Sequence, residues 1–322
     1  MSALNGRRVL ITGGSGFIGR HMVAELAAAG ATVRVIDLKP HPDPDVDVVR
    51  GDLADPDVLA AALAGGFDAV VHLAAVTSVL RSIEQPELTY RTNVAATAGL
   101  LEGARKAGVK ALAFASTNAV TGPMDAPAIS ESATLRPLTP YGATKAAGEM
   151  LMSAYTAVYG VRCACLRLTN VYGLGMQAKD SIVARLMRAI RTGGSFEIYG
   201  DGTQVRDYVN AADVVAAFRL ALGAERWAGP TVIGTGSSLS VLDVVDAVRR
   251  VTGAELEVGH GPAKAGEMPA VIVDPSRAKA AGWAPRYTFE EGLVGVWDEW
   301  SRADLDAINA GAPAAPVQAG GQ

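Results

Sequence analysis

The sequence has few residues of the kinds that build disulfide frameworks, metal centres or strongly charged surfaces. Of its 322 residues, 2 are cysteines and 4 are histidines, and the formal net charge is −4. Cys163 and Cys165 lie two apart in an apolar run, so a strand would place both on one face, where neighbouring cysteines seldom form a disulfide. The histidines, at positions 21, 41, 72 and 260, are scattered and are expected to be structural or solvated. No metal site is predicted.

Charge and hydropathy patterns argue against two further classes of partner. Lys and Arg residues form no basic stripe, which argues against nucleic acid. The apolar runs are interrupted well short of the roughly 18 residues that a membrane span needs, and the N-terminus enters a strand pattern without a signal-peptide pattern. We therefore expect a soluble, cytoplasmic protein with neither a membrane nor a nucleic-acid partner. The length allows one large domain or two modest ones.

Apolar strand patterns alternate with helical patterns through the first two-thirds of the chain. The strand patterns cover residues 7–12, 32–37, 46–50, 69–73, 110–116 and 161–167. Helical patterns include 86–107, 141–159, 181–192, 211–223, 240–252 and 288–303. This alternation predicts an α/β fold, a doubly wound parallel sheet of the Rossmann type with helices on both faces. The looser alternation after residue 170 predicts a smaller α/β C-terminal lobe, interleaved with the first.

The first strand pattern runs into a glycine-rich turn, Thr-Gly-Gly-Ser-Gly-Phe-Ile-Gly, and then into an amphipathic helix. Gly13, Gly16 and Gly19 allow a sharp turn and a close approach of the backbone to phosphates. Phe17 and Ile18 open the helix, whose N-terminus presents amide donors and a positive dipole end. The pattern predicts a dinucleotide pyrophosphate site. An ordinary glycine turn without a ligand is the alternative.

The second strand pattern ends in Asp37. An acidic residue at this position can accept both hydroxyl groups of an adenosine ribose and would repel a 2′-phosphate. The predicted cofactor is therefore NAD rather than NADP.

Two further groups of residues can carry chemistry. Tyr141 and Lys145 are four apart in a predicted helix, which places the phenol and the ammonium on one face. A free tyrosine ionises near pH 10, and we expect the neighbouring cation to lower the pKa of Tyr141 toward the value that a general base needs. In isolation such a pair is commonly a surface feature. Ser116 and Thr117 end another strand pattern, where ligands of doubly wound sheets bind.

With these features the chain resembles the extended short-chain dehydrogenase/reductase family and, within it, the nucleotide-sugar 4-epimerases of the UDP-glucose and UDP-galactose type. The resemblance covers roughly residues 7–303. Its motifs are Thr12-Gly-Gly-Ser-Gly-Phe-Ile-Gly19, Gly51-Asp-Leu53, His72-Leu-Ala-Ala75, Asn93, Tyr141 with Lys145, Arg167-Leu-Thr-Asn-Val-Tyr-Gly173, Tyr199-Gly-Asp-Gly202 and Arg206-Asp-Tyr208.

The resemblance implies contacts with both a cofactor and a substrate. Around NAD it places Asp52 and Leu53 at the adenine, Leu73, Ala74 and Ala75 along the cleft, and Asn93, Ser116, Tyr141 and Lys145 elsewhere along the cofactor. Around the nucleotide sugar it places Thr117, Asn170 and Arg206, with Tyr199 at the base, Lys264 at the diphosphate and Glu267 at the nucleoside ribose. It also implies a homodimer in which helices 86–107 and 141–159 form a four-helix bundle.

The residues that follow Thr117 favour one reaction of the family. Related 4,6-dehydratases carry Thr-Asp-Glu where this chain has Thr117-Asn118-Ala119, so the acids for dehydration are missing. Ala119 argues equally against the decarboxylases. What remains is 4-epimerisation through a transient 4-ketose, with Tyr141 as base and later acid, Thr117 as proton relay and Lys145 as the group that tunes Tyr141. The alternatives are a UDP-glucuronate 4-epimerase, another nucleotide-sugar dehydratase or decarboxylase, a net sugar dehydrogenase and a non-catalytic NAD-binding protein.

The expected organisation has three parts: an NAD-binding domain over 1–170, a mainly nucleotide-sugar-binding lobe over 171–308, and a disordered tail over 309–322, which consists of small residues and proline. The base and the sugar stay open. Thr121 and Lys264 depart from the family pattern, and Arg81 and Arg185 are expected to be solvated or structural charges.

Overall fold

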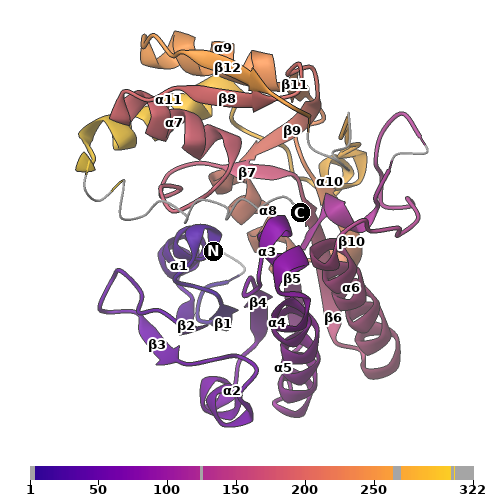
Figure 1. Ribbon diagram of the computed structural model, residues 1–322. Coiled ribbons are helices and arrows are strands. Elements are labelled where there is room, and N and C mark those ends of the chain that lie inside the picture. Colours follow the sequence, from indigo (N-terminus) through magenta and orange to yellow (C-terminus); the bar gives the residue numbers. More distant parts are fainter. Residues whose placement is uncertain (1–3, 124–125, 264–269, 306–307, 309–322) are drawn as a thin grey trace.

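A seven-stranded parallel sheet forms the centre of the computed structural model, which describes residues 4–123, 126–263, 270–305 and 308 (Figure 1). Its order is β10-β6-β5-β4-β1-β2-β3, and each neighbouring pair is parallel. The strands are β1 (Arg8–Thr12), β2 (Thr32–Asp37), β3 (Asp47–Arg50), β4 (Ala69–His72), β5 (Ala111–Thr117), β6 (Arg162–Leu168) and β10 (Gly229–Ile233). The predicted doubly wound fold is confirmed.

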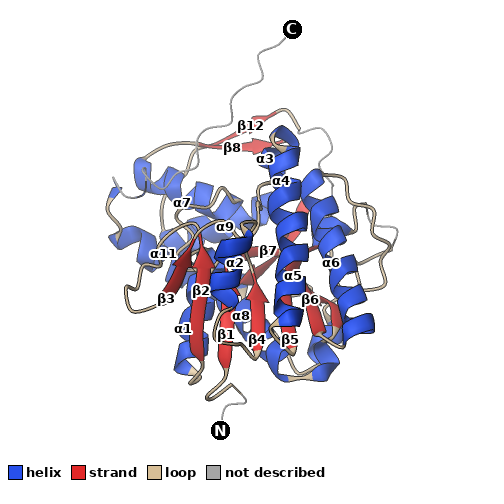
Figure 2. Cartoon of the chain, turned by 90° about the horizontal axis from the view of Figure 1, so that it is seen from below, coloured by secondary structure: helices blue, strands red, loops and turns tan. Residues whose placement is uncertain are grey.

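Helices cover both faces of this sheet (Figures 1 and 2). On one face α1 (Phe17–Ala28) and α8 (Ala211–Gly223) share a core with the strands, and on the other face α2 (Pro56–Leu63), α5 (Ala96–Lys106) and α6 (Pro140–Tyr159) share a second core. The central strands are apolar along their whole length because both of their faces are buried. Because all the strands are parallel, their carboxyl ends form one edge of the sheet. The residues predicted from the sequence converge toward this edge.

Local signals at its two ends fix the position of α6, the helix that carries Tyr141 and Lys145. Thr139 is the N-cap, and its hydroxyl accepts from the amide of Gly142 at 3.2 Å. Pro140 occupies the first turn, where its missing amide hydrogen costs nothing. Gly160, with a φ of 69°, ends the helix in the left-handed conformation.

The pattern predicted over 86–107 is helical but not uniformly α-helical. A π-helical turn, Arg91–Ala95, separates α4 (Pro86–Tyr90) from α5, and a further short helix, α3 (Val79–Glu84), precedes them. Periodicity alone does not reveal a π turn, because the one extra residue per turn shifts the pattern only locally.

Two smaller sheets lie beside the carboxyl edge of the large one and form most of the C-terminal lobe (Figure 1). One contains β11 (Ser238–Ser240), β9 (Val205–Asn210) and β7 (Asn170–Tyr172), and the other contains β12 (Val258–Gly261) and β8 (Phe196–Tyr199). With these sheets pack α7 (Ile182–Thr192), α9 (Val241–Thr252) and α11 (Phe289–Arg302), while the short α10 (Ser276–Ala280) lies beside β10. β10 belongs to the large sheet and α8 packs against it. The chain after residue 170 therefore contributes to both parts of the protein. The predicted tail 309–322 lies outside the described residues.

Candidate functional site

The glycine turn between β1 and α1 is shaped for close approach of a ligand to the backbone. Gly13 has a φ of +73°, and a Cβ atom there would lie 2.8 Å from the backbone nitrogen of Ala74. A Cβ atom at Gly19 would overlap the carbonyl oxygen of Gly13. The N-cap residue, Gly16, gives α1 no side-chain cap. The first amides of α1, from Phe17 onward, are thus left for an anion, as a dinucleotide pyrophosphate requires.

Asp37 lies beside this turn at the end of β2. Its carboxylate accepts the amide hydrogens of Ser15 and Lys39, each at 3.0 Å. These bonds orient the carboxylate and leave lone pairs for ribose hydroxyls. Asp52 accepts from the amide of Ala54 at 2.9 Å, and Leu53 beside it is buried. The arrangement fits the adenosine half of NAD.

The segment after β4 forms the adjoining wall. The amide of Ala74 donates to the Thr12 hydroxyl at 3.1 Å, which ties Leu73–Ala75 to the glycine turn. His72 hydrogen-bonds Thr12 through Nδ1 at 2.7 Å, and burial lowers the pKa of His72 to about 3. His72 is therefore a neutral structural residue, as the sequence predicts.

Asn93 lies in the π-helical turn and is fully buried. Its amide accepts from the backbone nitrogen of Val76 at 2.8 Å, donates to the Val76 carbonyl at 3.0 Å and donates to Thr144 Oγ1 at 3.1 Å. Both amide hydrogens are used in these contacts. Asn93 thus joins the wall after β4 to the first turns of α6.

Tyr141 and Thr117 meet at the carboxyl end of β5. A hydrogen bond joins their side chains, and the Tyr141 amide donates to Ser82 Oγ at 3.1 Å. Lys145, one turn further along α6, is 2% exposed, and its Nζ donates to the Ala115 carbonyl at 2.8 Å. The structure therefore brings together the three residues predicted to be catalytic.

The expected direction of the Tyr141 pKa is wrong for the protein on its own. Burial raises the pKa of Tyr141, and the hydrogen bond with Thr117 only partly opposes that effect. Burial also lowers the pKa of Lys145 to about 7, so its positive charge is itself disfavoured. The Lys145 ammonium is bonded to a carbonyl of β5, so it acts only weakly on the Tyr141 phenol. The spacing of four along the helix could not show this.

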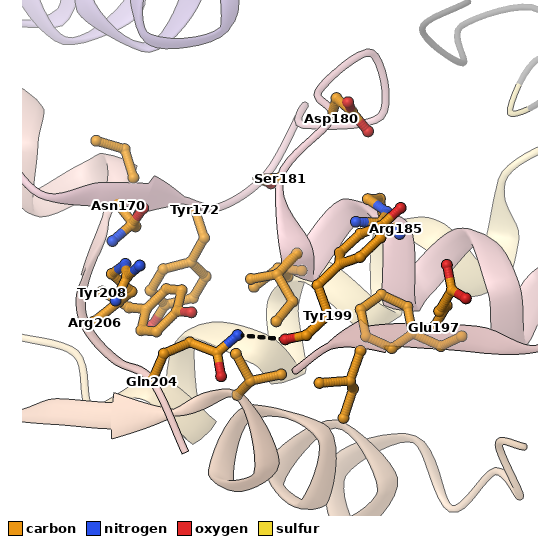
Figure 3. Close-up of a pocket in the computed structure, with 16 residues that line it drawn as sticks. Asn170, Tyr172, Asp180, Ser181, Arg185, Glu197, Tyr199, Gln204, Arg206 and Tyr208 are labelled. Atoms are coloured by element: carbon orange, nitrogen blue, oxygen red, sulfur yellow. Dashed lines mark hydrogen bonds between the residues drawn. The ribbon is translucent and has the colours of Figure 1, made fainter. Parts of the chain in front are cut away.

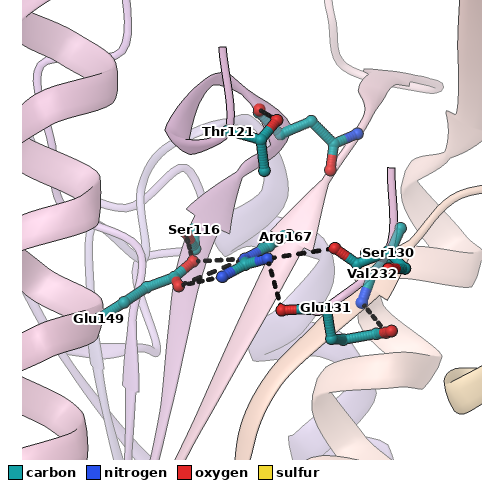
Figure 4. A network of polar contacts seen from close by, with 8 residues as sticks. Ser116, Thr121, Ser130, Glu131, Glu149, Arg167 and Val232 are labelled. Atoms are coloured by element: carbon teal, nitrogen blue, oxygen red, sulfur yellow. Dashed lines mark hydrogen bonds and ion pairs between the residues drawn. The ribbon is translucent and has the colours of Figure 1, made fainter. Parts of the chain in front are cut away.

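Ser116 points away from this group, because successive side chains of a strand alternate between its faces. Its hydroxyl donates to Glu149 Oε1 at 2.5 Å, and Glu149 in turn pairs with Arg167, whose Nη2 lies 2.8 Å from Oε2 (Figure 4). Arg167 also donates to the carbonyl of Glu131 at 3.2 Å. The network is buried and ties β5, β6 and α6 together. Glu149 lies one turn beyond Lys145 on α6, but it was not among the residues predicted from the sequence.

A pocket of about 290 Å³ opens in the C-terminal lobe between β7, β8, β9 and the N-terminus of α7 (Figure 3). Asn170, Tyr199 and Arg206 all line it, so the structure brings these three predicted residues together. Asn170 follows β6 closely, and in the sheet Leu168 of β6 is the partner of Thr117. The pocket and the Thr117–Tyr141 pair thus begin at neighbouring strand ends. Lys264 and Glu267 lie outside the described residues.

Arg185, expected to be a solvated or structural charge, also lines this pocket. Its guanidinium lies 5.8 Å from the centre of the Tyr199 ring and 5.1 Å from that of Phe196 (Figure 3). Helical periodicity puts Arg185 on the polar face of α7, but only the fold shows that β8 covers that face. Arg81 is exposed on α3, with its Nε 3.5 Å from the side chain of Gln85.

Other features bear on the remaining expectations. Cys163 and Cys165 are both buried and free. In the part of the chain that the structure describes, no group of three or more His, Cys, Asp or Glu side chains could hold a metal ion. Within the same residues, every helix is too short or too polar to span a membrane.

The known proteins that this chain resembles support the interpretation of the site. The family described as "NAD dependent epimerase/dehydratase family" matches residues 9–234. A putative UDP-glucose 4-epimerase of Methanocaldococcus jannaschii is 32% identical over 297 residues, which cover 89% of this chain and 96% of that protein. The UDP-glucose 4-epimerase of Thermus thermophilus, solved with NAD, is 35% identical with a TM-score of 0.87, and the match covers 92% of this chain and 100% of that one.

A third similar protein is MoeE5, solved with UDP-glucuronic acid and NAD. It is 38% identical with a TM-score of 0.84, over 92% of this chain and 99% of that one. The resemblance inferred from the motifs and the prediction of NAD are confirmed. Its glycine turn, its strand-end acid and its sequence along most of the chain show that the protein belongs to the NAD dependent epimerase/dehydratase family.

Proposed function

We propose that this protein is an NAD-dependent 4-epimerase that inverts C4 of a UDP-hexose of the UDP-glucose and UDP-galactose type. The observation that carries the proposal is the meeting of Thr117, Tyr141 and buried Lys145 beside the glycine turn. Relatives named UDP-glucose 4-epimerase, aligned over about nine-tenths of the chain, support the reaction. These relatives confirm the prediction that the protein is an NAD-dependent epimerase, and therefore an isomerase.

Tyr141 and Thr117 handle the proton of the sugar 4-hydroxyl. The Tyr141 oxygen takes this proton as the 4-ketose forms and gives it back to the 4-oxygen when the ketose is reduced. Bound NAD would supply the acceptor for the C4 hydride and the donor that returns it to the opposite face of the ketose, and its positive nicotinamide would favour the Tyr141 phenolate. Thr117 donates its hydrogen bond to the phenol or to the 4-oxygen and so keeps the two aligned. Lys145 favours the phenolate whenever it carries its proton.

The C-terminal lobe holds the nucleotide diphosphate while the sugar ring turns. In this assignment Arg206 and Asn170 bind the diphosphate, since a guanidinium makes paired, charge-assisted bonds with phosphate. Tyr199 borders the base, and Lys264 and Glu267 add the contacts predicted from the resemblance. Strong contacts to the diphosphate and weak contacts to the ring let the 4-ketose rotate without leaving.

The cofactor contacts form the second half of the assignment. Asp37 accepts the adenosine ribose hydroxyls, and Asp52 and Leu53 flank the adenine. Leu73–Ala75 and Asn93 shape the wall of the cleft. Ser116, which the resemblance placed along the cofactor, makes no direct contact with it in this assignment, because its hydroxyl donates to Glu149.

Asn118 and Ala119 favour epimerisation over elimination of water. Neither side chain can donate a proton as a carboxylic acid, and Asn118 is buried directly after Thr117. A uronate substrate is the second candidate, because MoeE5 was solved with UDP-glucuronic acid and Arg185 adds a cation to the pocket.

A proton NMR time course tests the proposal and separates the candidates. The purified protein, with only catalytic NAD, is incubated with UDP-glucose, UDP-N-acetylglucosamine and UDP-glucuronate in separate tubes. We expect the C4-inverted product from UDP-glucose without accumulation of NADH. Inversion of UDP-glucuronate alone would select the uronate reaction. Accumulation of NADH would select a dehydrogenase, and loss of C5 or C6 signals would select a dehydratase.

We further propose a cytoplasmic homodimer. Large apolar side chains on α4 and α6, among them Tyr90, Met150 and Val158, are exposed on the single chain. A four-helix bundle with a second copy would cover such side chains. Two free buried thiols accord with a reducing compartment. Light scattering should give twice the chain mass of 33.1 kDa, and a monomer at micromolar concentration would contradict the dimer.

A further inference from the structure

A loop of the C-terminal lobe, residues 173–181 between β7 and α7, crosses over to α1. Arg20 Nη2 on α1 donates to the Gly175 carbonyl at 2.8 Å, and His21 Nε2 on α1 hydrogen-bonds the Leu174 carbonyl at 2.8 Å. The amide of Gly175 donates to Glu299 Oε2 at 2.8 Å. The loop is thus fixed between α1 and α11.

Lys179 is the cation that this loop brings to α1. Its Nζ lies 5.9 Å from the centre of the Phe17 ring, and Phe17 is the first residue of α1. Asp180 and Ser181, which follow Lys179, line the pocket of the C-terminal lobe (Figure 3). Lys179 is therefore placed between the glycine turn on one side and that pocket on the other.

The surroundings of Lys179 supply little to offset its charge. The side chain is partly buried, and burial lowers the pKa of Lys179. No carboxylate among the described residues opposes this effect, whereas Lys106 on the surface pairs with Glu102 at 3.4 Å. A desolvated charge without a counter-charge is unfavourable, and an anionic ligand removes that cost.

Phosphate is the anion that this place favours. The amides at the start of α1 and the positive end of the helix dipole attract negative charge to the same side of the molecule. An ammonium meets phosphate as a compact point charge with three donors. A diphosphate has enough oxygens and charge to meet these amides and the ammonium at once, whereas chloride or a lone carboxylate carries a single charge and fewer acceptor atoms.

We infer that the Lys179 ammonium binds a phosphate oxygen of a nucleotide diphosphate held beside the start of α1, so that the 173–181 loop contacts the ligand directly. The inference rests on the proposed function, which supplies two such ligands, the pyrophosphate of NAD and the diphosphate of the nucleotide sugar. The position beside Phe17 favours NAD. In either case Lys179 links the two lobes through a ligand that both contact.

The test compares Lys179→Met with Lys179→Arg, and with Lys279→Met, which removes an exposed lysine on α10. Calorimetry measures the binding of ADP-ribose and of UDP, and of adenosine and uridine as matched ligands without phosphate. The rate at which bound NAD is lost is measured in parallel. No turnover is needed, so failure of the epimerase proposal would leave this result interpretable.

We expect Lys179→Met to weaken either ADP-ribose or UDP about tenfold or more at low salt, with less difference at high salt. Adenosine and uridine should bind as they do to the unchanged protein, Lys179→Arg should retain most of the affinity, and Lys279→Met should have no effect. A loss with ADP-ribose identifies the cofactor as the ligand, and a loss with UDP identifies the substrate. Equal binding of both diphosphates by Lys179→Met and the unchanged protein would overturn the inference, as would an equal loss for the nucleosides.

Discussion

The hydrogen bonds around His72 specify one neutral form of its ring. Thr97 gives its hydroxyl hydrogen to the Asn93 carbonyl at 2.7 Å, so its oxygen accepts from His72 Nε2 at 2.8 Å. Thr12 Oγ1 accepts the amide hydrogen of Ala74, so its own hydrogen is directed to His72 Nδ1. The ring therefore carries one hydrogen, on Nε2. A second hydrogen, on Nδ1, would face the hydroxyl hydrogen of Thr12 and would lie near the Lys145 charge.

This arrangement makes the stability of the protein sensitive to acid. Burial first, and the Lys145 charge second, lower the pKa of His72 from 6.5 to about 3. Between these values the unfolded chain binds a proton that the native protein does not, so stability falls as the pH falls from 6.5 toward 3. The contribution of His72 to the free energy of unfolding is complete above pH 6.5. At about 1.36 kcal/mol for each pH unit, this contribution has fallen by about 2 kcal/mol at pH 5.

Urea unfolding followed by circular dichroism at pH 7 and pH 5 measures this effect. His72→Gln keeps a donor and an acceptor but does not titrate, so the carboxylates that titrate in both proteins cancel in the comparison. We expect the unchanged protein to lose about 2 kcal/mol more than His72→Gln between the two pH values. A lower starting stability of the variant does not enter, because only the change with pH is compared. Equal losses would refute the neutral, buried His72.

Three further substitutions test separate parts of the site. Tyr141→Phe should lower turnover by about 10²- to 10⁴-fold in a coupled assay while bound NAD is retained, and wild-type turnover would remove Tyr141 from the role of base. Asp37→Ala should weaken NAD and narrow its advantage over NADP in fluorescence titrations; an unchanged ratio of the two affinities would contradict the ribose contact. Glu149→Gln should cost about 3–5 kcal/mol in urea unfolding, since Arg167 stays buried without its counter-charge, and a loss near zero would show that the pair does not hold α6 to the sheet.

The parts of the site that follow from sequence are those encoded by neighbours along the chain. The glycine turn, Asp37 at the end of a strand and the Tyr141–Lys145 spacing each depend on a few consecutive residues. The parallel sheet then brings these segments to one edge, because its strands all end on the same side. For this reason the Thr117–Tyr141 contact could be expected before the fold was seen.

The parts that sequence did not reveal depend on packing between distant segments. Glu149 meets Arg167 only when α6 lies on β6, and Arg185 faces the pocket only when β8 covers α7. The Tyr141 pKa depends on burial and on the direction of the Lys145 side chain, and neither is set by a spacing of four. Asn93 belongs here too, since its three bonds require the π-helical turn beside Val76.

The most direct test of the central claim follows one hydrogen atom. UDP-galactose carrying deuterium at C4 is converted by the protein with only catalytic NAD, and the product is analysed by NMR and mass spectrometry. If C4 of the sugar is oxidised and reduced again within one site, the UDP-glucose that forms keeps the deuterium at C4 and no NADH accumulates. Loss of the deuterium to solvent, or reduced cofactor formed in step with substrate consumed, would contradict the account.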